Sequence, residues 1–279
     1  MTKNFQGKTV FITGAGSGIG YQTALVFAGE GATIVATDVN PAGLEQLRQE
    51  IEHLGGQCHC YSLDVTDETA YVALAEQLAE SGPLPDIVIN NAGLGVISPF
   101  LETSTADWRL TLDVNVLGVA LGCRLFSGLW KQRAMPGHLV NVSSMAAFSP
   151  PANLSAYVAS KYAVEGLSEV LAMELQDYDI AVSCVHPGVI NTAIVHNSSL
   201  MKLEPAQIER LQRHYVEEGV HPRVVAEDIV RGVRNKAGTI LSGKDVGKIA
   251  FLKRLLPRKA FRRVLIGASR KIGYLPEKS

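Results

Sequence analysis

Short apolar runs alternate along the chain with longer stretches in which apolar and polar residues mix. The runs are rich in β-branched residues and end in glycine, asparagine or aspartate, which is typical of buried strands followed by turns. This pattern predicts strands at residues 8–13, 33–37, 57–63, 86–89, 138–142, 180–185 and 239–242. The stretches between them predict helices at residues 21–30, 41–54, 67–80, 103–132 (either continuous or broken) and 155–177.

This alternation of strand and helix is the main indicator of the fold. Short strands that lack a polar face imply a parallel sheet covered by helices on both sides. Residues 1–243 are therefore predicted to form one α/β domain with a doubly wound parallel sheet, followed by a basic C-terminal extension over residues 244–279. Ligands of such sheets bind beyond the carboxyl ends of the strands, so functional residues are expected directly after them.

A glycine-rich turn follows the first predicted strand. It reads GAGSGIG over residues 14–20, with the spacing G-x-x-x-G-x-G. Glycines permit a tight turn and a close approach of the backbone, and the helix N-terminus behind the turn favours a phosphate. Such turns can also serve only to pack a helix on a strand, but the position after the opening strand favours a nucleotide. The predicted contacts are Gly14, Gly16, Ser17, Gly18, Ile19 and Gly20.

Asp38 lies just after the second predicted strand, eighteen residues beyond Gly20. A carboxylate at this position can accept hydrogen bonds from an adenosine ribose and would repel a 2′-phosphate. Neither Val39 nor Asn40 carries a positive charge that could attract that phosphate. The sequence therefore favours NAD over NADP, although Asp38 could instead cap the helix that begins near Pro41.

A tyrosine and a lysine, Tyr157 and Lys161, are four residues apart in the last long predicted helix. Residues at this spacing share a helix face, so both side chains would project into the same space. A cation beside a phenol favours the phenolate and lowers its pKa, which makes the tyrosine usable as an acid/base near neutral pH. The spacing alone is common and does not identify a function.

Together these residues resemble the short-chain dehydrogenase/reductase family. The matching motifs follow the family's order, cover about residues 5–243, and are individually weak but jointly specific. They are TGAGSGIG (13–20), Asp64-Val65, NNAG (90–93), Asn115, Ser143-Ser144, Tyr157-x-x-x-Lys161, and Pro187-Gly188 followed by Thr192. The resemblance implies a Rossmann-like fold, an NAD(P)-dependent oxidoreductase acting on alcohols or ketones, and a homodimer or homotetramer formed through the helices near 103–132 and 155–177.

The resemblance also implies the catalytic residues. Tyr157 would exchange a proton with the substrate oxygen, and Ser144 rather than Ser143 would hydrogen-bond that oxygen. Lys161 would hydrogen-bond the nicotinamide ribose, and Asn115 would hold a water for a proton relay. Bringing a tyrosine from its usual pKa of about 10 to about 7 requires roughly 4 kcal/mol of preferential phenolate stabilisation. Lys161 and the positive nicotinamide ring are expected to supply it together.

Further cofactor contacts are implied after the other strands. Asp64 and Val65 would contact the adenine, although Asp64 could equally be a turn residue, and Thr192 would bond the nicotinamide carboxamide. Tyr157 and Lys161 would face the cofactor as well as the substrate. The remaining implied contacts are Asn90, Asn91, Ala92, Gly93, Pro187, Gly188 and Val189.

The substrate lid is expected at about residues 190–219, with further walls from residues 145–154 and 94–97. These segments are mostly apolar, which favours a hydrophobic secondary alcohol or ketone over a phosphorylated sugar. Two alternatives stay open. One is a 3-oxoacyl thioester reductase, which NADP preference would indicate; the other is a nucleotide-binding or membrane-recruited protein with little turnover.

Charge is unevenly distributed along the chain. The formal net charge is −1, yet the segment from Lys244 to Ser279 has 11 Lys/Arg and 2 acidic residues, which makes +9 and leaves −10 for the first 243 residues. Ile249, Leu252 and Leu256 form an apolar stripe within this segment. A basic amphipathic segment can lie on an anionic membrane surface, cover the substrate pocket or form a subunit interface. No base-reading module is recognisable, so nucleic-acid binding is not expected.

The remaining features favour a cytoplasmic protein, with peripheral membrane contact through the tail left open. Four cysteines in 279 residues do not suggest a disulfide framework. Cys58 and Cys60 flank His59, but no second ligand cluster follows, so no metal site is expected. The N-terminus has no apolar core like that of a signal peptide, and no uninterrupted apolar run approaches the ~20 residues of a spanning helix.

Overall fold

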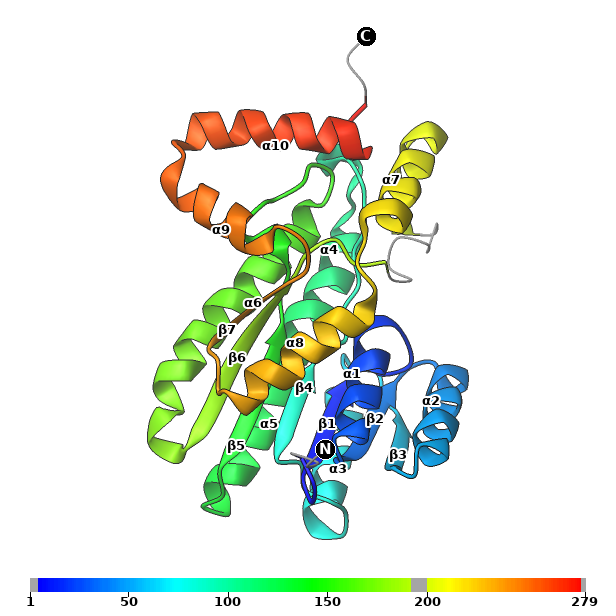
Figure 1. Cartoon of the computed structure of the whole chain (residues 1–279), viewed down its shortest axis with the longest axis vertical. Coiled ribbons are helices and arrows are strands. Elements are labelled where there is room, and N and C mark those ends of the chain that lie inside the picture. Colours follow the sequence, from blue (N-terminus) through cyan, green and yellow to red (C-terminus); the bar gives the residue numbers. More distant parts are fainter. Residues whose placement is uncertain (1–4, 192–199, 277–279) are drawn as a thin grey trace.

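The chain forms a parallel sheet between two layers of helices in a computed structural model that describes residues 5–191 and 200–276 (Figure 1). Within these residues the sheet has seven strands in the order β3-β2-β1-β4-β5-β6-β7, and every neighbouring pair is parallel. The strands are β1 (Thr9–Thr13), β2 (Thr33–Asp38), β3 (Gln57–Ser62), β4 (Ile87–Asn90), β5 (Gly137–Val142), β6 (Ile180–Pro187) and β7 (Thr239–Ser242). The predicted doubly wound parallel sheet is confirmed.

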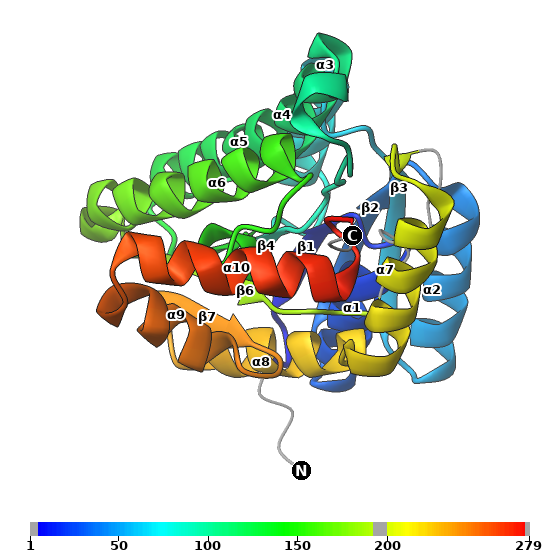
Figure 2. The ribbon, with the colours of Figure 1, turned by 90° about the horizontal axis from the view of Figure 1, so that it is seen from above.

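Two layers of helices cover the two faces of the sheet. Figure 2 shows α1, α2 and α8 on one side and α3, α4, α5 and α6 on the other, with α10 crossing above the carboxyl ends of the strands. The helices are α1 (Gly18–Gly29), α2 (Pro41–His53), α3 (Glu68–Glu80), α4 (Thr105–Leu112), α5 (Gly118–Gln132), α6 (Ser155–Glu174), α7 (Pro205–Glu218), α8 (Pro222–Arg234), α9 (Val246–Leu255) and α10 (Arg258–Ile272).

The central strands are apolar throughout because both of their faces are covered. All five residues of β1 are buried. Its side chains alternate, so Val10 and Ile12 join the core on the α1 side, whereas Phe11 joins the core on the α5 side. The strand order changes direction between β1 and β4, which opens the crevice in which ligands of such sheets bind.

Helices α1, α7 and α8 differ from the sequence prediction, whereas the helix over 103–132 takes the broken form that the prediction left open. Helix α1 begins at Gly18, because the glycine-rich turn runs directly into it. The helix predicted over 103–132 is broken: α4 passes through a π-helical turn at Asp113–Leu117 into α5. Helix α8 was not predicted, and it packs against α1 through buried residues that include Val225 and Ile229.

The combined stretch Thr105–Gln132 is long and apolar enough to span a membrane by length and composition, although charged residues such as Arg109 and Arg124 interrupt it. Its α5 part nevertheless packs on the sheet, since Val119, Phe126 and Trp130 are buried in the core. The Trp130 indole donates a hydrogen bond to the Pro85 carbonyl at 2.7 Å. We therefore interpret this stretch as a core helix.

Candidate active site

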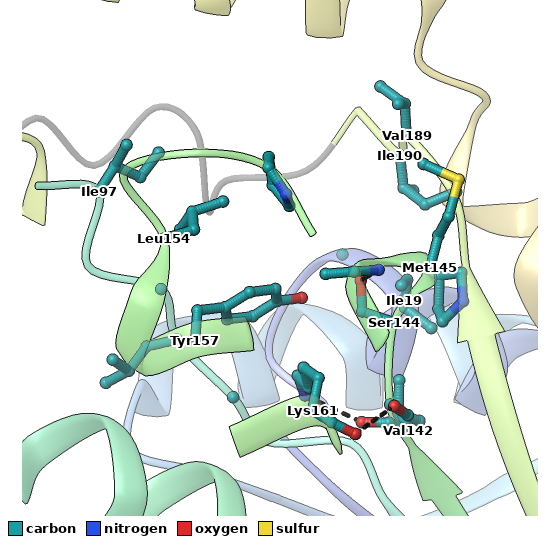
Figure 3. A pocket seen from close by; sticks show the side chains of 18 of the residues that line it. Ile19, Ile97, Val142, Ser144, Met145, Leu154, Tyr157, Lys161, Val189 and Ile190 are labelled. Carbon is teal, nitrogen blue, oxygen red and sulfur yellow. Dashed lines mark hydrogen bonds between the residues drawn. The ribbon is translucent and has the colours of Figure 1, made fainter. Parts of the chain in front are cut away.

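A cavity of about 660 Å³ lies at the carboxyl ends of the strands, where the strand order changes direction. Its lining comes from the glycine-rich turn, from the segments that follow β2, β3, β4, β5 and β6, and from α6, α7 and α10. Figure 3 shows residues of this cavity from close by. A cavity of this size and position suits a dinucleotide together with a small substrate.

The backbone of the glycine-rich turn is not covered by side chains. Gly14 and Gly18 have left-handed φ angles of 64° and 56°. A Cβ on Gly20 would lie 2.3 Å from the Gly14 carbonyl oxygen, so no side chain fits there. The Asn91 amide donates to the carbonyl oxygens of Thr13 and Gly14 at 2.9 and 3.0 Å and ties this turn to the end of β4. Of the predicted residues in the turn, those that line the cavity are Gly14, Ser17, Gly18 and Ile19.

The Asp38 carboxylate is fixed beside this turn by two backbone N–H groups. One oxygen accepts from Gly16 at 2.8 Å and the other from Asn40 at 2.9 Å. A Cβ on Gly16 would lie 2.9 Å from the Asp38 carboxyl carbon, so the glycine lets the carboxylate approach. The helix-capping alternative does not hold, because Asn40 is the N-cap of α2 and accepts from Gly43.

Asp64 and Val65 both line the cavity after β3. One Asp64 oxygen accepts from the Thr66 backbone at 2.9 Å and from its hydroxyl at 2.7 Å. Asp64 is thus a turn residue, and its position at the cavity also leaves it free to contact an adenine.

The NNAG segment divides between cavity and core. Asn91, Ala92 and Gly93 line the cavity. Asn90 does not, and the prediction for it is wrong: it is 2% exposed and donates to Asn141 Oδ1 at 2.9 Å. Asn90 is the last residue of β4 and its side chain is directed into the helix layer, where it also meets Cys123 Sγ at 3.3 Å.

Tyr157 and Lys161 share one face of α6 and both line the cavity, as their spacing predicts. The Tyr157 hydroxyl is directed towards Ser144, and Lys161 lies one turn further along α6 (Figure 3). The Lys161 ammonium donates to the Val142 carbonyl oxygen at 2.9 Å and lies 5.5 Å from the centroid of the Tyr157 ring. The cation therefore faces the ring and the backbone.

Burial dominates the electrostatics of this group. It raises the pKa of Tyr157 to about 12, against the opposing effect of the hydrogen bond with Ser144. It lowers the pKa of Lys161 to about 8. Within the chain alone the lowering expected from Lys161 is absent, and the buried Tyr157 is a neutral hydrogen-bond donor at neutral pH.

The two adjacent serines have different partners. The buried Ser143 hydroxyl donates to the Lys161 carbonyl oxygen at 2.8 Å and so fastens α6 to the end of β5. Ser144 Oγ accepts from the Ala146 N–H at 3.1 Å, at the start of a short 3₁₀ turn. Its remaining hydrogen-bonding capacity faces Tyr157. Both serines line the cavity, and Ser144 rather than Ser143 stays the predicted contact of the substrate oxygen.

Asn115 is fully buried in the π-helical turn between α4 and α5. Its Oδ1 accepts from the Leu94 N–H at 2.9 Å, and its Nδ2 donates to the Leu94 carbonyl at 2.8 Å and to Ser160 Oγ at 3.0 Å. A Cβ on Gly93 would lie 3.3 Å from Asn115 Oδ1 and 3.4 Å from Lys161 Nζ, so both side chains border that glycine. The amide of Asn115 thus positions the loop at Leu94.

The segment after β6 completes the predicted cofactor side. Pro187, Gly188 and Val189 line the cavity, and the Gly188 N–H donates to the Ser242 carbonyl at 2.9 Å. Thr192 lies outside the described residues. Among residues 5–191 and 200–276 no group of three or more His, Cys, Asp or Glu side chains could hold a metal ion.

The substrate side contains residues that the sequence analysis did not assign. The expected walls are present and include Ile97, Met145, Leu154 and Ile190. A further wall comes from the C-terminal extension, where the lining residues are Leu265, Ala268, Ser269, Ile272 and Tyr274. Of the three roles left open for this extension, α10 therefore covers the pocket.

Comparison with known proteins agrees with this geometry. The family model described as short chain dehydrogenase matches residues 8–203. The chain is 38% identical over 255 residues to "Probable oxidoreductase EphD" of Mycobacterium tuberculosis (strain ATCC 25618 / H37Rv), covering 89% of this chain but only 43% of that protein. The chain thus spans less than half the length of that relative. It is 33% identical over 257 residues to C alpha-dehydrogenase of Sphingobium sp. (strain NBRC 103272 / SYK-6), covering 88% of this chain and 83% of that one.

Solved structures lead to the same family. A short chain dehydrogenase/reductase from Burkholderia phymatum in complex with NAD superposes with a TM-score of 0.79 at 26% identity, covering 99% of this chain and 98% of that chain. Similar solved chains contain NAD or NADP, so the cofactor that the comparisons support is a nicotinamide dinucleotide. With its glycine-rich turn and its Ser144, Tyr157 and Lys161 arranged at the carboxyl ends of a doubly wound sheet, the chain belongs to the short-chain dehydrogenase/reductase family.

Proposed function

We propose that the protein is an NAD-dependent enzyme that interconverts a hydrophobic secondary alcohol and the corresponding ketone. The observation that carries this proposal is the convergence of the Ser144 and Tyr157 hydroxyls in the cavity above the buried Lys161. Two hydroxyls directed at one point can both hydrogen-bond a single substrate oxygen, which is what carbonyl reduction and alcohol oxidation require.

Each side chain then has one task. Ser144 holds and polarises the substrate oxygen, and Tyr157 donates a proton to it in reduction or accepts one in oxidation. Lys161 would hold the nicotinamide ribose, and its charge would favour the phenolate when Tyr157 has lost its proton. The bound nicotinamide supplies or accepts the hydride. Asn115 keeps the loop at Leu94 beside this group.

The preference for NAD rests on Asp38. Its carboxylate is fixed at the cavity beside the glycine-rich turn, where it can accept from a ribose diol and would repel a 2′-phosphate. The neighbouring Val39 is 65% exposed and carries no charge to offset that repulsion. Replacing Asp38 with serine should therefore lower kcat/KM with NAD and raise it with NADP.

The proposed activity is tested by following NADH formation with a panel of secondary alcohols, from short aliphatic to steroid-sized. The same panel is measured with NADP in place of NAD. Tyr157→Phe should reduce kcat by at least about 100-fold, because it removes the proton donor while keeping the ring. NADH binding, measured by fluorescence titration, should stay unchanged in this variant. Undiminished turnover in Tyr157→Phe would refute the assigned role. Higher kcat/KM for 3-oxoacyl thioesters with NADPH would replace the proposal with the reductase alternative.

The outward side of the C-terminal helices favours contact with an anionic membrane surface. Phe251 and Leu255 of α9 are 61% and 62% exposed, and Arg254, Arg258 and Arg262 are exposed around them. These helices lie at one end of the molecule, beyond the carboxyl ends of the strands (Figure 1). Binding is therefore expected to vesicles containing phosphatidylglycerol and not to vesicles of phosphatidylcholine alone.

Co-sedimentation of variants with vesicles distinguishes this membrane contact from nonspecific adsorption. The double variant Phe251→Ser/Leu255→Ser should stay in the supernatant, whereas Leu101→Ser, at a residue that is 94% exposed elsewhere, should sediment like the unmodified chain. Equal sedimentation of all three would leave the protein without a specific membrane contact and favour a purely cytoplasmic enzyme.

Self-association is also proposed, through the outer face of the α4–α6 layer. Leu117, Val170 and Met173 are exposed there by 61%, 45% and 69%. Exposed apolar side chains gathered on neighbouring helices are typical of subunit interfaces. Sedimentation-equilibrium measurements are expected to give a dimer or tetramer, and Met173→Lys should shift the distribution towards smaller species.

A further inference from the structure

The cavity holds a second pair of hydroxyls besides those of Ser144 and Tyr157. Tyr215 of α7 and Tyr274, just beyond α10, both line the cavity, and their hydroxyl oxygens are 2.7 Å apart. Tyr274 is only 4% exposed. Figure 2 shows the end of α10 next to α7, which brings two segments far apart in sequence to one place. We call Tyr215 and Tyr274 the tyrosine pair.

Several hydrogen bonds fix the position of Tyr274. The chain leaves α10 through Gly273, whose φ of 109° is favourable only for glycine, and the Gly273 carbonyl accepts from Gln207 at 3.2 Å. The Tyr274 carbonyl accepts from Asn153 at 2.6 Å, and the Leu275 N–H donates to the Ser269 carbonyl at 3.0 Å. The backbone around Tyr274 is thus held by α7, by the loop before α6 and by α10, and this positions its side chain.

The tyrosine pair has unused hydrogen-bonding capacity. Each phenol has one O–H donor, and the single bond between the two uses only one of the two protons. Among the described residues neither hydroxyl has another hydrogen-bond partner. Burial raises the pKa of both phenols, so both remain neutral and one proton stays available for a ligand. A buried donor without a partner is unfavourable, and a ligand oxygen would satisfy it.

The tyrosine pair and the reacting centre share one apolar chamber. Ile97, Leu154 and Tyr274 belong to a single hydrophobic cluster, against which Tyr157 and Tyr215 also pack. The shared low-dielectric surroundings appear in the electrostatics as well, since Tyr215 raises the pKa of Tyr157. A molecule whose oxygen meets Tyr157 would therefore extend along apolar side chains towards the tyrosine pair.

We propose that the tyrosine pair is a recognition subsite for a second, uncharged oxygen of the substrate. The substrate class is then a hydrophobic skeleton with the reacting alcohol or ketone at one end and a hydroxyl, ether or carbonyl oxygen at the other. Charged groups are disfavoured, because no cation accompanies the neutral phenols among the described lining residues of this part of the cavity and burial lowers the pKa of the neighbouring His214. This proposal rests on the proposed function.

The test uses matched alcohols that share a carbon skeleton and differ only in the far oxygen, with cyclic, aryl-alkyl and steroid members. With the unmodified enzyme, kcat/KM should be roughly 10-fold higher for the oxygenated member of the best pair, as one hydrogen bond of ordinary strength would give. Tyr274→Phe and Tyr215→Phe should remove that advantage, mainly through KM, by lowering kcat/KM of the oxygenated member about 10-fold more than that of the mono-oxygenated member. Tyr178→Phe, at an exposed residue of the surface, is the matched control.

In parallel, isothermal calorimetry measures how tightly each matched alcohol binds to the protein in the presence of NADH. A binding preference for the oxygenated member that disappears in Tyr274→Phe, without any turnover, would support the subsite and overturn the proposed function. Turnover with no preference between members would overturn the subsite and leave the proposed function standing. Equal losses for both members in the phenylalanine variants would also overturn it, because they would show a purely structural role.

Discussion

Replacing Lys161 with methionine should stabilise the fold while abolishing turnover. Lys161 is only 4% exposed, and burial lowers its pKa from 10.5 to about 8. The depression means that the folded protein holds the lysine proton less tightly than the unfolded chain does. A lysine retained at such a position points to a requirement of function rather than of stability.

The size of this stabilisation and its pH dependence follow from the pKa of Lys161 in the unfolded and in the folded chain. Below about pH 8 both states are protonated, and the folded state bears the full penalty of 10.5 − 8 = 2.5 pKa units, or about 3 kcal/mol. Between about pH 8 and 10.5 the folded lysine is neutral while the unfolded one is still charged, so the penalty fades and stability rises with pH. Methionine also loses the hydrogen bond to the Val142 carbonyl, which offsets about 1–2 kcal/mol. The variant should therefore be more stable than the unmodified chain by about 1–2 kcal/mol near pH 7.

Urea unfolding at about pH 7 and about pH 9.5 measures the stability difference between the variant and the unmodified chain, and how that difference changes with pH. The stability advantage of Lys161→Met should fall by about 2 kcal/mol between these two conditions, because the unmodified chain gains that much. Lys248→Met, at a side chain that is 81% exposed, controls for removal of a lysine charge in general. A difference between Lys161→Met and the unmodified chain that is the same at both pH values would refute the reasoning.

Two further predictions test the site, each with a control variant. Ser144→Ala should lower kcat by roughly 100-fold, as loss of one hydrogen-bond donor to a developing charge does. Ser143→Ala, whose hydroxyl instead bonds the Lys161 carbonyl, should mainly lower stability, by about 1 kcal/mol; the reverse ranking in kcat would show that the wrong serine was chosen. Gly20→Ala should abolish NADH binding in a fluorescence titration, because its Cβ would lie 2.3 Å from the Gly14 carbonyl oxygen. Gly29→Ala, which meets no atom within 4 Å, should bind NADH normally, and similar affinity in both variants would contradict the role given to the turn.

The parts that could be predicted from the sequence depend on local periodicity. Apolar runs located every strand of the sheet, and a spacing of four placed Tyr157 and Lys161 on one helix face. The missed helix α8 carries a comparable signal, with a proline in its first turn and Val225, Ile229 and Val233 spaced by four. Helix α8 directly follows the expected lid, a region for which the sequence prediction gave no helix.

Asn90 shows where local pattern is insufficient. Two consecutive asparagines at the end of a strand face opposite ways, and only the exact end of β4 decides which one reaches the cavity. The pKa of Tyr157 shows a second limit. The spacing indicated a neighbouring cation, but the burial that raises the pKa of Tyr157 depends on the folded packing.

The wall formed by α10 could not be derived from sequence periodicity, because it depends on contacts between distant parts of the chain. The bond between Asn153 and the Tyr274 carbonyl joins residues 121 positions apart. An amphipathic stripe indicates that a helix packs against something, without indicating what. The same stripe was compatible with a membrane, a partner subunit or the pocket.

Because this wall follows the last strand in the sequence, chemistry and substrate choice are encoded in separate stretches of the chain. The reacting groups come from residues 115–161, whereas the last wall comes from residues 265–274. Substitution, lengthening or exchange of the C-terminal segment can therefore change which molecule is accepted without altering the proposed reacting centre. Selection can therefore change the substrate preference through the C-terminal segment alone. Exchanging this segment between family members should transfer the substrate preference with it.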